Sequence, residues 1–337
     1  MDFKQTLKRL QLLTILTQVG EHLNQDLQTI EKDWWVTQVL RVLFSLPYAE
    51  YMSFKGGTSL SKAWNLVDRF SEDIDIAISR EYLGFDGELS RTQVSDKLRR
   101  AACTFVRETL QNDVRNGLLA LGIGADKFTV RVNITSVSTV DPEVIYVDYQ
   151  SGLPQSEYIA HTVKIEVSGR SMHDPIDSVP LCSLIDQYLP QTKIAMPAFE
   201  ASVVVPERTF LEKVMLIHEE FAKPIAEVRT ERMSRHLYDL ERMMRTDIMD
   251  KALADEQLYR TVLEHRRKFI GLKGFDYDTL YPQTLSLCIP AEVLPKWKQD
   301  YETMQKTMIY GDSLPFDELL TRISQLNARI SSLPFTK

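Results

Sequence analysis

Apolar residues recur every three or four positions in two segments at the start of the chain, the spacing of amphipathic helices. The spacing predicts one helix over 4–30 and a second over 33–46, which Pro47 ends. Trp34 and Trp35 are adjacent in the second helix and could stack on a base, but their place in the apolar pattern favours the core.

The pattern changes to strict alternation at the segment Asp73-Ile-Asp-Ile-Ala-Ile78. Residues two apart on a strand point to the same face, about 7 Å from one another. Asp73 and Asp75 therefore share one face, and the isoleucines take the other, core-facing side. Before this strand the sequence predicts another strand ending near Phe54, a tight turn at Gly56 and Gly57, and a helix.

The middle of the chain alternates between helical and strand patterns. Helical spacing predicts one long helix over 92–121, broken near Asn116-Gly117. Alternation predicts three strands, over 128–134, 144–149 and 162–167. In the last of them Lys164 and Glu166 share a face.

Proline-rich sequence separates this region from an all-helical remainder. Residues 169–206 read as a connector with one short helix near 181–188, because turn-forming residues are frequent there. From 207 onward the chain carries helical patterns, including 294–308 and 315–330. We therefore expect two domains, 1–200 and 201–337.

Composition fits a protein of the cytoplasm. Of the 337 residues 44% are hydrophobic and 26% charged, and no apolar run approaches the roughly 20 residues that span a bilayer. The three cysteines are far apart and match neither a zinc site nor a disulfide framework. We expect a cytoplasmic protein with no membrane partner.

Charge is distributed unevenly along the chain. The net charge is −7, but 229–273 holds eleven Lys and Arg against eight Asp and Glu, so that stretch carries +3 and the remainder −10. Solvated helix faces explain such a stretch, and so does a surface that meets RNA phosphates. Sequence alone leaves both interpretations open.

The glycine turn and the paired aspartates together point to phosphate chemistry. Backbone amides at Gly57 and Thr58 open a helix and can bind an anion. Asp73 and Asp75 are suited to hold Mg²⁺. A phosphate cradle followed by a two-carboxylate metal site is typical of phosphoryl or nucleotidyl transfer.

These motifs carry a family resemblance. Gly56-Gly-Thr58 followed by Arg69-Phe-Ser-Glu-Asp-Ile-Asp75 resembles the first motif of the AbiEii/AbiGii toxin family, within the polymerase-β-like nucleotidyltransferases. The superfamily has Ser where this chain has Thr58. The resemblance implies an α+β fold, with a mixed-sheet nucleotidyltransferase domain followed by an α-helical bundle and the active site in the cleft between them.

The resemblance also implies roles for individual residues. Glu166 matches the third metal-binding acid, although the family pattern Lys-x-Asp reads Lys164-Ile-Glu166 here. With Asp73 and Asp75 it would bind two Mg²⁺ ions, or Mn²⁺ in their place. The remaining nucleotide contacts implied are Gly56, Gly57, Thr58, Lys62, Lys213 and Asp239. Within Arg235-His-Leu-Tyr-Asp239, the alternative for Asp239 is a helical ion pair with Arg235.

By this resemblance the chain moves NMP from an NTP to an acceptor hydroxyl, at an RNA (tRNA) 3′ end. It would act as the toxin of a toxin–antitoxin or phage-defence system, with a separate antitoxin protein. Two alternatives stay open: an enzyme that modifies protein, and a catalytically decayed module that binds nucleotide or antitoxin.

Overall fold

The computed structural model describes residues 3–71, 73–133, 137–154 and 160–337. The chain divides into two compact units. The first consists of Met1–Ala63 and Glu72–Val203, and the second of Trp64–Ser71 and Val204–Lys337. The short segment 64–71 therefore belongs to the second unit, although it lies between two elements of the first. Within the described residues no helix is both long and apolar enough to cross a membrane.

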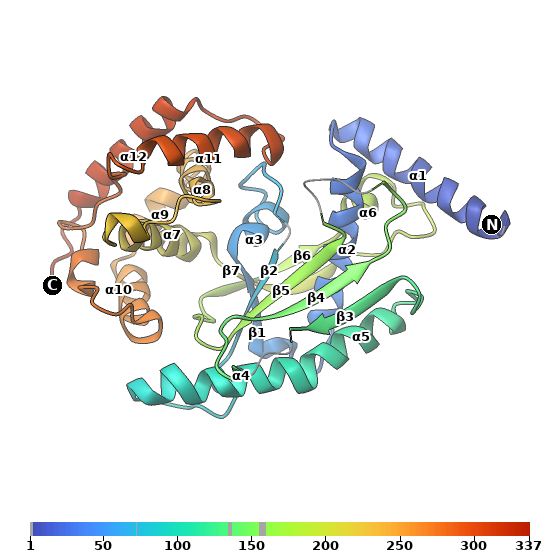
Figure 1. The fold of residues 1–337 in the computed structure, drawn as a ribbon, viewed down its shortest axis with the longest axis horizontal. Coiled ribbons are helices and arrows are strands. Elements are labelled where there is room, and N and C mark those ends of the chain that lie inside the picture. The colour runs from blue at the N-terminus through green and yellow to red at the C-terminus, as the bar shows by residue number, and fades with distance from the viewer. Residues whose placement is uncertain (1–2, 72, 134–136, 155–159) are drawn as a thin grey trace. The chain divides into compact units, whose positions relative to one another are not determined.

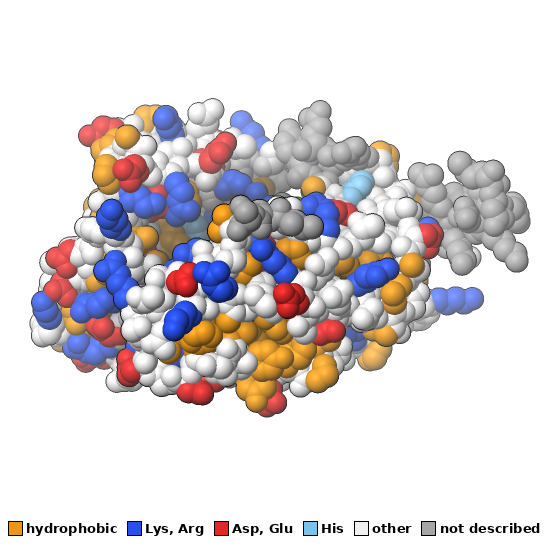
Figure 2. Space-filling view, turned by 60° about the horizontal axis from the view of Figure 1, so that its bottom comes forward, with side chains coloured by type: hydrophobic (Ala, Val, Ile, Leu, Met, Phe, Trp, Pro, Cys, Tyr) orange, Lys and Arg blue, Asp and Glu red, His pale blue; other side chains and the backbone are white. Residues whose placement is uncertain are grey.

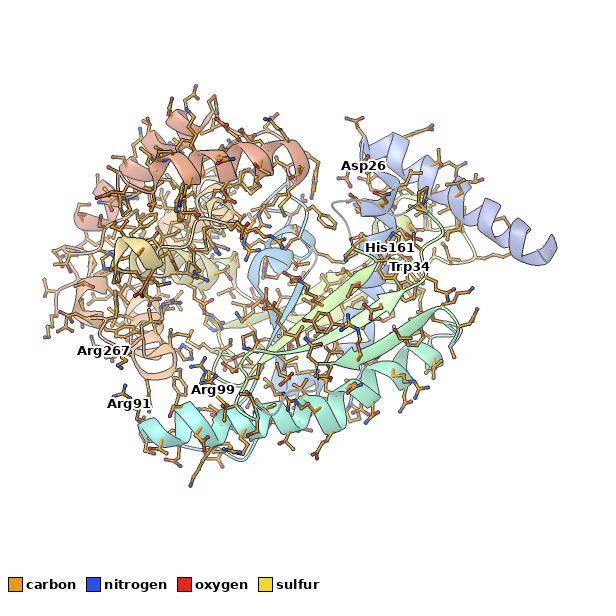
Figure 3. The ribbon with its side chains drawn as sticks, viewed as in Figure 1. Asp26, Trp34, Arg91, Arg99, His161 and Arg267 are labelled. Atoms are coloured by element: carbon orange, nitrogen blue, oxygen red, sulfur yellow. The ribbon has the colours of Figure 1, made fainter. Side chains whose placement is uncertain are left out.

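Two helices begin the first unit, α1 (Phe3–Leu23) and α2 (Leu27–Leu43). The prediction of one helix to residue 30 was wrong, because Asn24 takes a positive φ of 52° that a right-handed helix does not allow. The second helix consequently starts at Leu27. Trp34 lies on α2 (Figure 3) and packs against a small apolar cluster with Leu16 and Ile30. Its neighbour Trp35 is buried and stacks on Tyr149, as a core position requires.

A seven-stranded mixed sheet forms the centre of the first unit, in the order β3-β4-β5-β2-β1-β7-β6 (Figure 1). The mixed sheet of the predicted fold class is confirmed. Its strands are β1 (Met52–Lys55), β2 (Asp73–Ile78), β3 (Phe128–Val132), β4 (Glu143–Tyr149), β5 (Thr162–Ser168), β6 (Ile176–Leu181) and β7 (Phe199–Val204). The predicted strand over 128–134 ends at Val132, and residue 134 lies outside the described part.

The central strands have one apolar and one polar face. Ile74, Ile145 and Ile165 are fully buried, and their polar neighbours along each strand point to the other side. β2 pairs antiparallel with β1 and parallel with β5, which pairs antiparallel with β4. The functional residues predicted on β2 and β5 thus come to adjacent strands.

A continuous helical segment covers part of this sheet. It consists of η2 (Gln93–Leu98), α4 (Arg99–Phe105), η3 (Val106–Leu110) and α5 (Gln111–Ala120). The predicted break near Asn116-Gly117 was wrong. Gly117 instead lets α5 approach α2 closely, since a Cβ there would lie 2.3 Å from Cγ1 of Val42.

The prediction of a connector with one short helix over 169–206 was incomplete. It contains strands β6 and β7 as well as the short helix α6 (Leu184–Tyr188). β6 forms one edge of the sheet, where Pro180 is tolerated because an edge strand need not donate every backbone N–H.

The second unit is helical within its described residues. A Pro at the first helical position opens α7, which is amphipathic and buries most of its length. The main helices are α7 (Pro206–Phe221), α8 (Ser234–Met244), α9 (Ile248–Ala254), α10 (Glu256–His265), α11 (Leu294–Thr307) and α12 (Phe316–Ser331).

Candidate active site

The turn before α3 (Gly56–Lys62) fixes the position of one carboxylate. Gly56 has a φ of 81°, and a Cβ on it would lie 2.1 Å from Oδ2 of Asp75. Only glycine combines this backbone conformation with this close approach. The hydroxyl of Thr58 donates to the backbone carbonyl of Asp73 at 2.5 Å, which ties α3 to the start of β2.

Strand register brings three carboxylates and a lysine to one face of the sheet. In the parallel pairing of β2 with β5, Asp73 is opposite Lys164 and Asp75 is opposite Glu166. Directly paired residues on neighbouring strands share a face. Lys55, which the sequence interpretation did not select, lies opposite Asp75 on β1. The alternation on β1 alone could not single out this lysine.

The carboxylates on this face repel one another. Burial raises the pKa of Glu166, and the negative charges of Asp75 and Asp73 raise it further. Lys164 and Lys55 act in the opposite direction, but more weakly. Oδ1 of Asp73 is buried and has no hydrogen-bond partner among the described residues, and Nζ of Lys164 lies 3.8 Å away. An extra positive charge would relieve this arrangement.

The donor set fits a divalent cation such as Mg²⁺. Carboxylate oxygens are its preferred protein ligands, and a buried carboxylate oxygen without a hydrogen bond is available to bind it. No three His, Cys, Asp or Glu side chains in the described part of the chain are already gathered as a metal-binding group. The aspartate pair on β2 is therefore the core of the candidate site, with Glu166 on the adjacent strand.

Lys62 is engaged elsewhere in the first unit. Its Nζ binds Oδ1 of Asp33 at 2.5 Å and the carbonyl oxygen of Cys182 at 3.2 Å. These contacts hold α3 against α2 and the segment before α6. The roles predicted for Lys62 in binding triphosphate, and for Gly57 and Thr58 beside it, stay predictions.

Asp239 is the centre of a second group of charges, located in the helical unit. Its carboxylate is fully buried and accepts two hydrogen bonds from Arg69, at 2.6 and 2.7 Å. Lys213 binds the same carboxylate at 2.9 Å. The predicted site residues Lys213 and Asp239 are thus in direct contact. The main partner of Asp239 is Arg69, which lies 170 positions away in the sequence. No local sequence pattern could predict this ion pair.

The three charges set one another's pKa values. Burial alone would raise the pKa of Asp239, but Arg69 and Lys213 outweigh it and hold that pKa well below its usual range. Burial and the charge of Arg69 lower the pKa of Lys213, against the attraction of Asp239. The pKa of His236 lies well below its usual value because of burial and the cations Lys213 and Arg235. His236 is therefore neutral near pH 7.

Segment 64–71 carries part of the family motif and is held within the second unit. The backbone N–H of Phe70 donates to the carbonyl of Met308 at 2.7 Å, and that of Tyr310 donates to Asp68 at 3.1 Å. A partly exposed ion pair between Arg242 and Asp68 adds a side-chain contact at 2.6 Å. The stretch between the glycine turn and the aspartates thus contains a segment that packs within the second unit. Glu72 lies outside the described residues.

The basic stretch over 229–273 consists largely of ion-paired side chains. Arg245 binds Glu241, Arg260 binds Glu256, and Lys251 binds Asp247. Figure 2 shows Lys and Arg side chains interspersed with Asp and Glu over the visible surface. This pairing favours the solvated-helix interpretation of the stretch.

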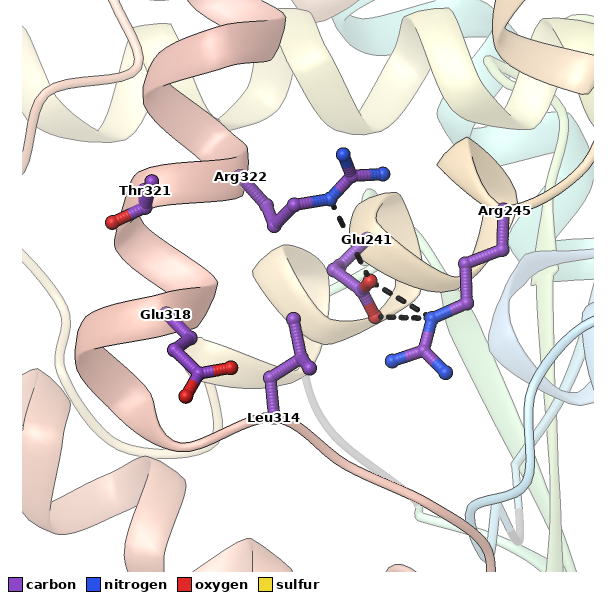
Figure 4. A pocket seen from close by; sticks show the side chains of 6 residues that line it. All are labelled: Glu241, Arg245, Leu314, Glu318, Thr321 and Arg322. Carbon is purple, nitrogen blue, oxygen red and sulfur yellow. Dashed lines mark hydrogen bonds and ion pairs between the residues drawn. The ribbon is translucent and has the colours of Figure 1, made fainter.

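A cavity of about 470 Å³ lies in the helical unit (Figure 4). Glu241 lines it and is paired with Arg245 at 2.8 Å and with Arg322 at 4.0 Å. Leu314, Glu318 and Thr321 complete its lining, which includes none of the predicted site residues.

Comparison with known proteins gives the family. A sequence model of the nucleotidyl transferase AbiEii toxin, of type IV toxin–antitoxin systems, matches residues 38–322. Among solved structures, MenT4, a nucleotidyltransferase toxin of Mycobacterium tuberculosis, is 15% identical over 94% of this chain and 99% of its own, with a TM-score of 0.47. JHP933 of Helicobacter pylori is 13% identical over 90% and 92%, with a TM-score of 0.42. No curated protein matches the chain.

The matched region includes the glycine turn, the paired aspartates, Glu166, Lys213 and Asp239, and it spans well over half of the sequence. The chain belongs to the AbiEii family of nucleotidyltransferase toxins of type IV toxin–antitoxin systems.

Proposed function

We propose that this nucleotidyltransferase moves NMP from an NTP to the 3′-terminal hydroxyl of an RNA, with tRNA as the expected acceptor. One observation carries the proposal: the register of β2 with β5 places Asp73, Asp75, Glu166 and Lys164 on one face. The repulsion among these carboxylates supports a cation-binding role, because it is a cost that a bound cation would remove.

Asp73, Asp75 and Glu166 would hold Mg²⁺, as two ions, with Mn²⁺ as the substitute. When bound, the metal supplies positive charge for the attacking and leaving oxygens of an in-line displacement. The buried Oδ1 of Asp73 and the position of Asp75 against Gly56 support this assignment.

The residues of the chain bind and orient the two substrates, and one of them accepts a proton. Attack by the acceptor oxygen forms a bond to the α-phosphorus, the bond from that phosphorus to the bridging oxygen breaks, and pyrophosphate leaves. The proton of the acceptor hydroxyl would pass to the carboxylate of Glu166, the third acid on this face of the sheet. Lys164 offsets negative charge beside Asp73.

Gly56, Gly57, Thr58, Lys62 and Lys213 complete the proposed nucleotide contacts. Asp239 would act on the nucleotide indirectly, because its two cationic partners already satisfy its carboxylate. It keeps Lys213 oriented and charged inside a buried environment, which would otherwise favour the neutral amine.

As a toxin of a type IV system, the chain would be opposed by a separate antitoxin protein. Expression without that partner should arrest growth in proportion to transfer activity. The Asp73→Asn variant should be harmless at the same protein level, because it removes the charge at the centre of the site and keeps the side-chain shape.

The direct test is label transfer. Purified protein, Mg²⁺ and total tRNA are incubated with each α-labelled NTP in turn, beside Asp73→Asn and Asp75→Asn. We expect RNA labelling by one or more NTPs, at least about 100-fold weaker in either variant, the loss typical of removing a major electrostatic contact in a transition state. Chelation by EDTA should abolish it, and Mn²⁺ should restore it.

Other outcomes separate the alternatives. Label on protein instead of RNA would favour the protein-modifying enzyme. If toxicity persists in Asp73→Asn and no acceptor is labelled by the wild type, the decayed binding module becomes the better explanation.

A further inference from the structure

A row of four paired residues leads across the sheet to the proposed metal site. Arg131 on β3 is opposite Tyr146 on β4, Tyr146 is opposite Lys164 on β5, and Lys164 is opposite Asp73 on β2. Residues paired in this way share one face, and neighbouring strands are about 4.8 Å apart. Tyr146 is therefore two strands, or about 10 Å, from Asp73 along the row.

The row lies on the side of the sheet opposite its apolar face. Ile145, Val147 and Val163, which alternate with these residues, are fully buried. The side chains of the row reach solvent to different extents: Asp73 is 21% exposed, Lys164 37% and Arg131 50%, and Tyr146 between them is partly buried. Figure 1 shows the β3–β4–β5 surface of the first unit, with α4 and α5 packed beside these strands.

Arg131 and Tyr146 form a preassembled stack at the outer end of the row. The guanidinium lies over the tyrosine ring, 4.3 Å from its centroid. Asp148, two residues along β4 and on the same face, fixes that position with bonds to Arg131 at 2.6 and 3.3 Å. Thr162 in turn donates to Asp148 at 2.6 Å. A planar cation and an aromatic ring are thus held in place on a polar sheet surface.

We infer that the Arg131–Tyr146 stack is the binding platform for a single-stranded RNA end, holding the bases next to the terminal nucleotide whose hydroxyl reacts. Unpaired RNA bases are bound by stacking on aromatic rings and on guanidinium planes. The stacked guanidinium and ring favour RNA over a protein acceptor, because they match unpaired bases, and the row places them beside the carboxylates. The inference therefore rests on the proposed function.

The test compares acceptor binding with nucleotide binding in matched variants. Tyr146→Ala removes the ring, Tyr146→Phe keeps it, and Arg131→Lys keeps the charge but loses the planar group. Thr129→Ala is the control, since Thr129 is exposed on the same strand and face but in the adjacent row. The KM for total tRNA and for the NTP is measured for each, with circular dichroism to confirm folding.

We expect Tyr146→Ala to raise the KM for tRNA about tenfold or more, the effect of losing one stacked base, and to leave the KM for the NTP unchanged. Tyr146→Phe and Thr129→Ala should resemble the wild type, and Arg131→Lys should raise the KM for tRNA several-fold. An unchanged KM for tRNA in folded Tyr146→Ala would overturn the inference while leaving the proposed function intact.

Direct binding separates failure of the inference from failure of the proposed function. A fluorescent single-stranded oligoribonucleotide is titrated with each variant in the absence of NTP, and its anisotropy is followed. Weaker binding in Tyr146→Ala, again by about tenfold, supports the platform even if the wild type labels no RNA. Equal binding by Tyr146→Ala and the wild type overturns it.

Discussion

Glu166 shows at the scale of one residue how a functional site opposes stability. Burial and two neighbouring aspartates raise its pKa, so at neutral pH its charge is held in an unfavourable place. Replacing Glu166 with Gln removes that charge and keeps the side-chain shape. We therefore expect Glu166→Gln to be more stable than the wild type when both are free of metal, and to have lost transfer activity when both are assayed with Mg²⁺.

The expected gain is about 1 kcal/mol, or roughly 2–4 °C in Tm, measured by thermal unfolding in EDTA. The pH dependence follows from the direction of the shift. The folded pKa is raised, so the wild type recovers stability as pH falls through that pKa and Glu166 takes up a proton. The advantage of Glu166→Gln should be largest at neutral pH and shrink in acid. Equal Tm values at pH 7 would contradict this account.

At Gly56 a substitution would have two effects that can be separated: strain in the backbone and displacement of the Asp75 carboxylate. Gly56→Ala introduces a Cβ where φ is 81° and where Oδ2 of Asp75 is only 2.1 Å away. Gly84→Ala is the matched control, because Gly84 has a φ of 83° and open space around its Cβ position. Each variant should lose about 1–2 kcal/mol from the left-handed conformation. Only Gly56→Ala should also lose nucleotide transfer, because the new Cβ forces the Asp75 carboxylate to move. Comparable transfer activity in the two variants would mean that the position of Asp75 does not matter for the reaction.

At the scale of elements, the sequence predicts those strands and helices whose apolar residues follow a regular alternation or spacing. β2 shows acid on one face and isoleucine on the other, and the same alternation on β5 identified Lys164 and Glu166. β6 was missed because Pro180 within it speaks against a strand, a rule that an edge position relaxes. The partnership of Arg69 with Asp239 joins residues 170 positions apart, and no local pattern encodes such a contact.

The buried charges around α8 make a prediction about stability. Asp239→Asn leaves Arg69 and Lys213 buried without a counter-charge, which typically costs about 3–5 kcal/mol. Asp68→Asn breaks the partly exposed pair with Arg242 and should cost less than about 1 kcal/mol. Urea unfolding of both variants measures the difference. Because the folded pKa of Asp239 is lowered, its contribution is present at neutral pH and is lost as acid protonates it, below about pH 4.

If Asp239→Asn proves no more costly than Asp68→Asn, the buried group does not hold the second unit together. A large loss with unchanged KM for NTP in the folded fraction would make Asp239 a structural residue alone. A raised KM for NTP in protein shown to be folded would support its proposed part in orienting Lys213.

At the scale of the whole molecule, the chain order and the structural units do not coincide. Segment 64–71 lies between α3 and β2 in sequence but belongs to the second unit, where Arg69 binds Asp239. A chain cut between Val203 and Val204 therefore separates Arg69 from its partner. We expect a 204–337 fragment to be much less stable than the same residues within the full chain, because Asp239 keeps only Lys213 as counter-charge.

The fragment also changes the effect of substituting Asp239. In the full chain Asp239→Asn leaves two buried cations, Arg69 and Lys213, without their counter-charge. In the fragment Arg69 is absent, so only Lys213 loses its partner. The cost of the substitution should consequently fall by about half, as in a double-mutant cycle that removes one partner first. Thermal unfolding of the four proteins, followed by circular dichroism at 222 nm as a roughly helix-specific signal, measures it. If Asp239→Asn lowers the stability of the fragment and of the full chain equally, the ion pair with Asp239 is not how Arg69 contributes to stability. Arg69 would then serve another purpose.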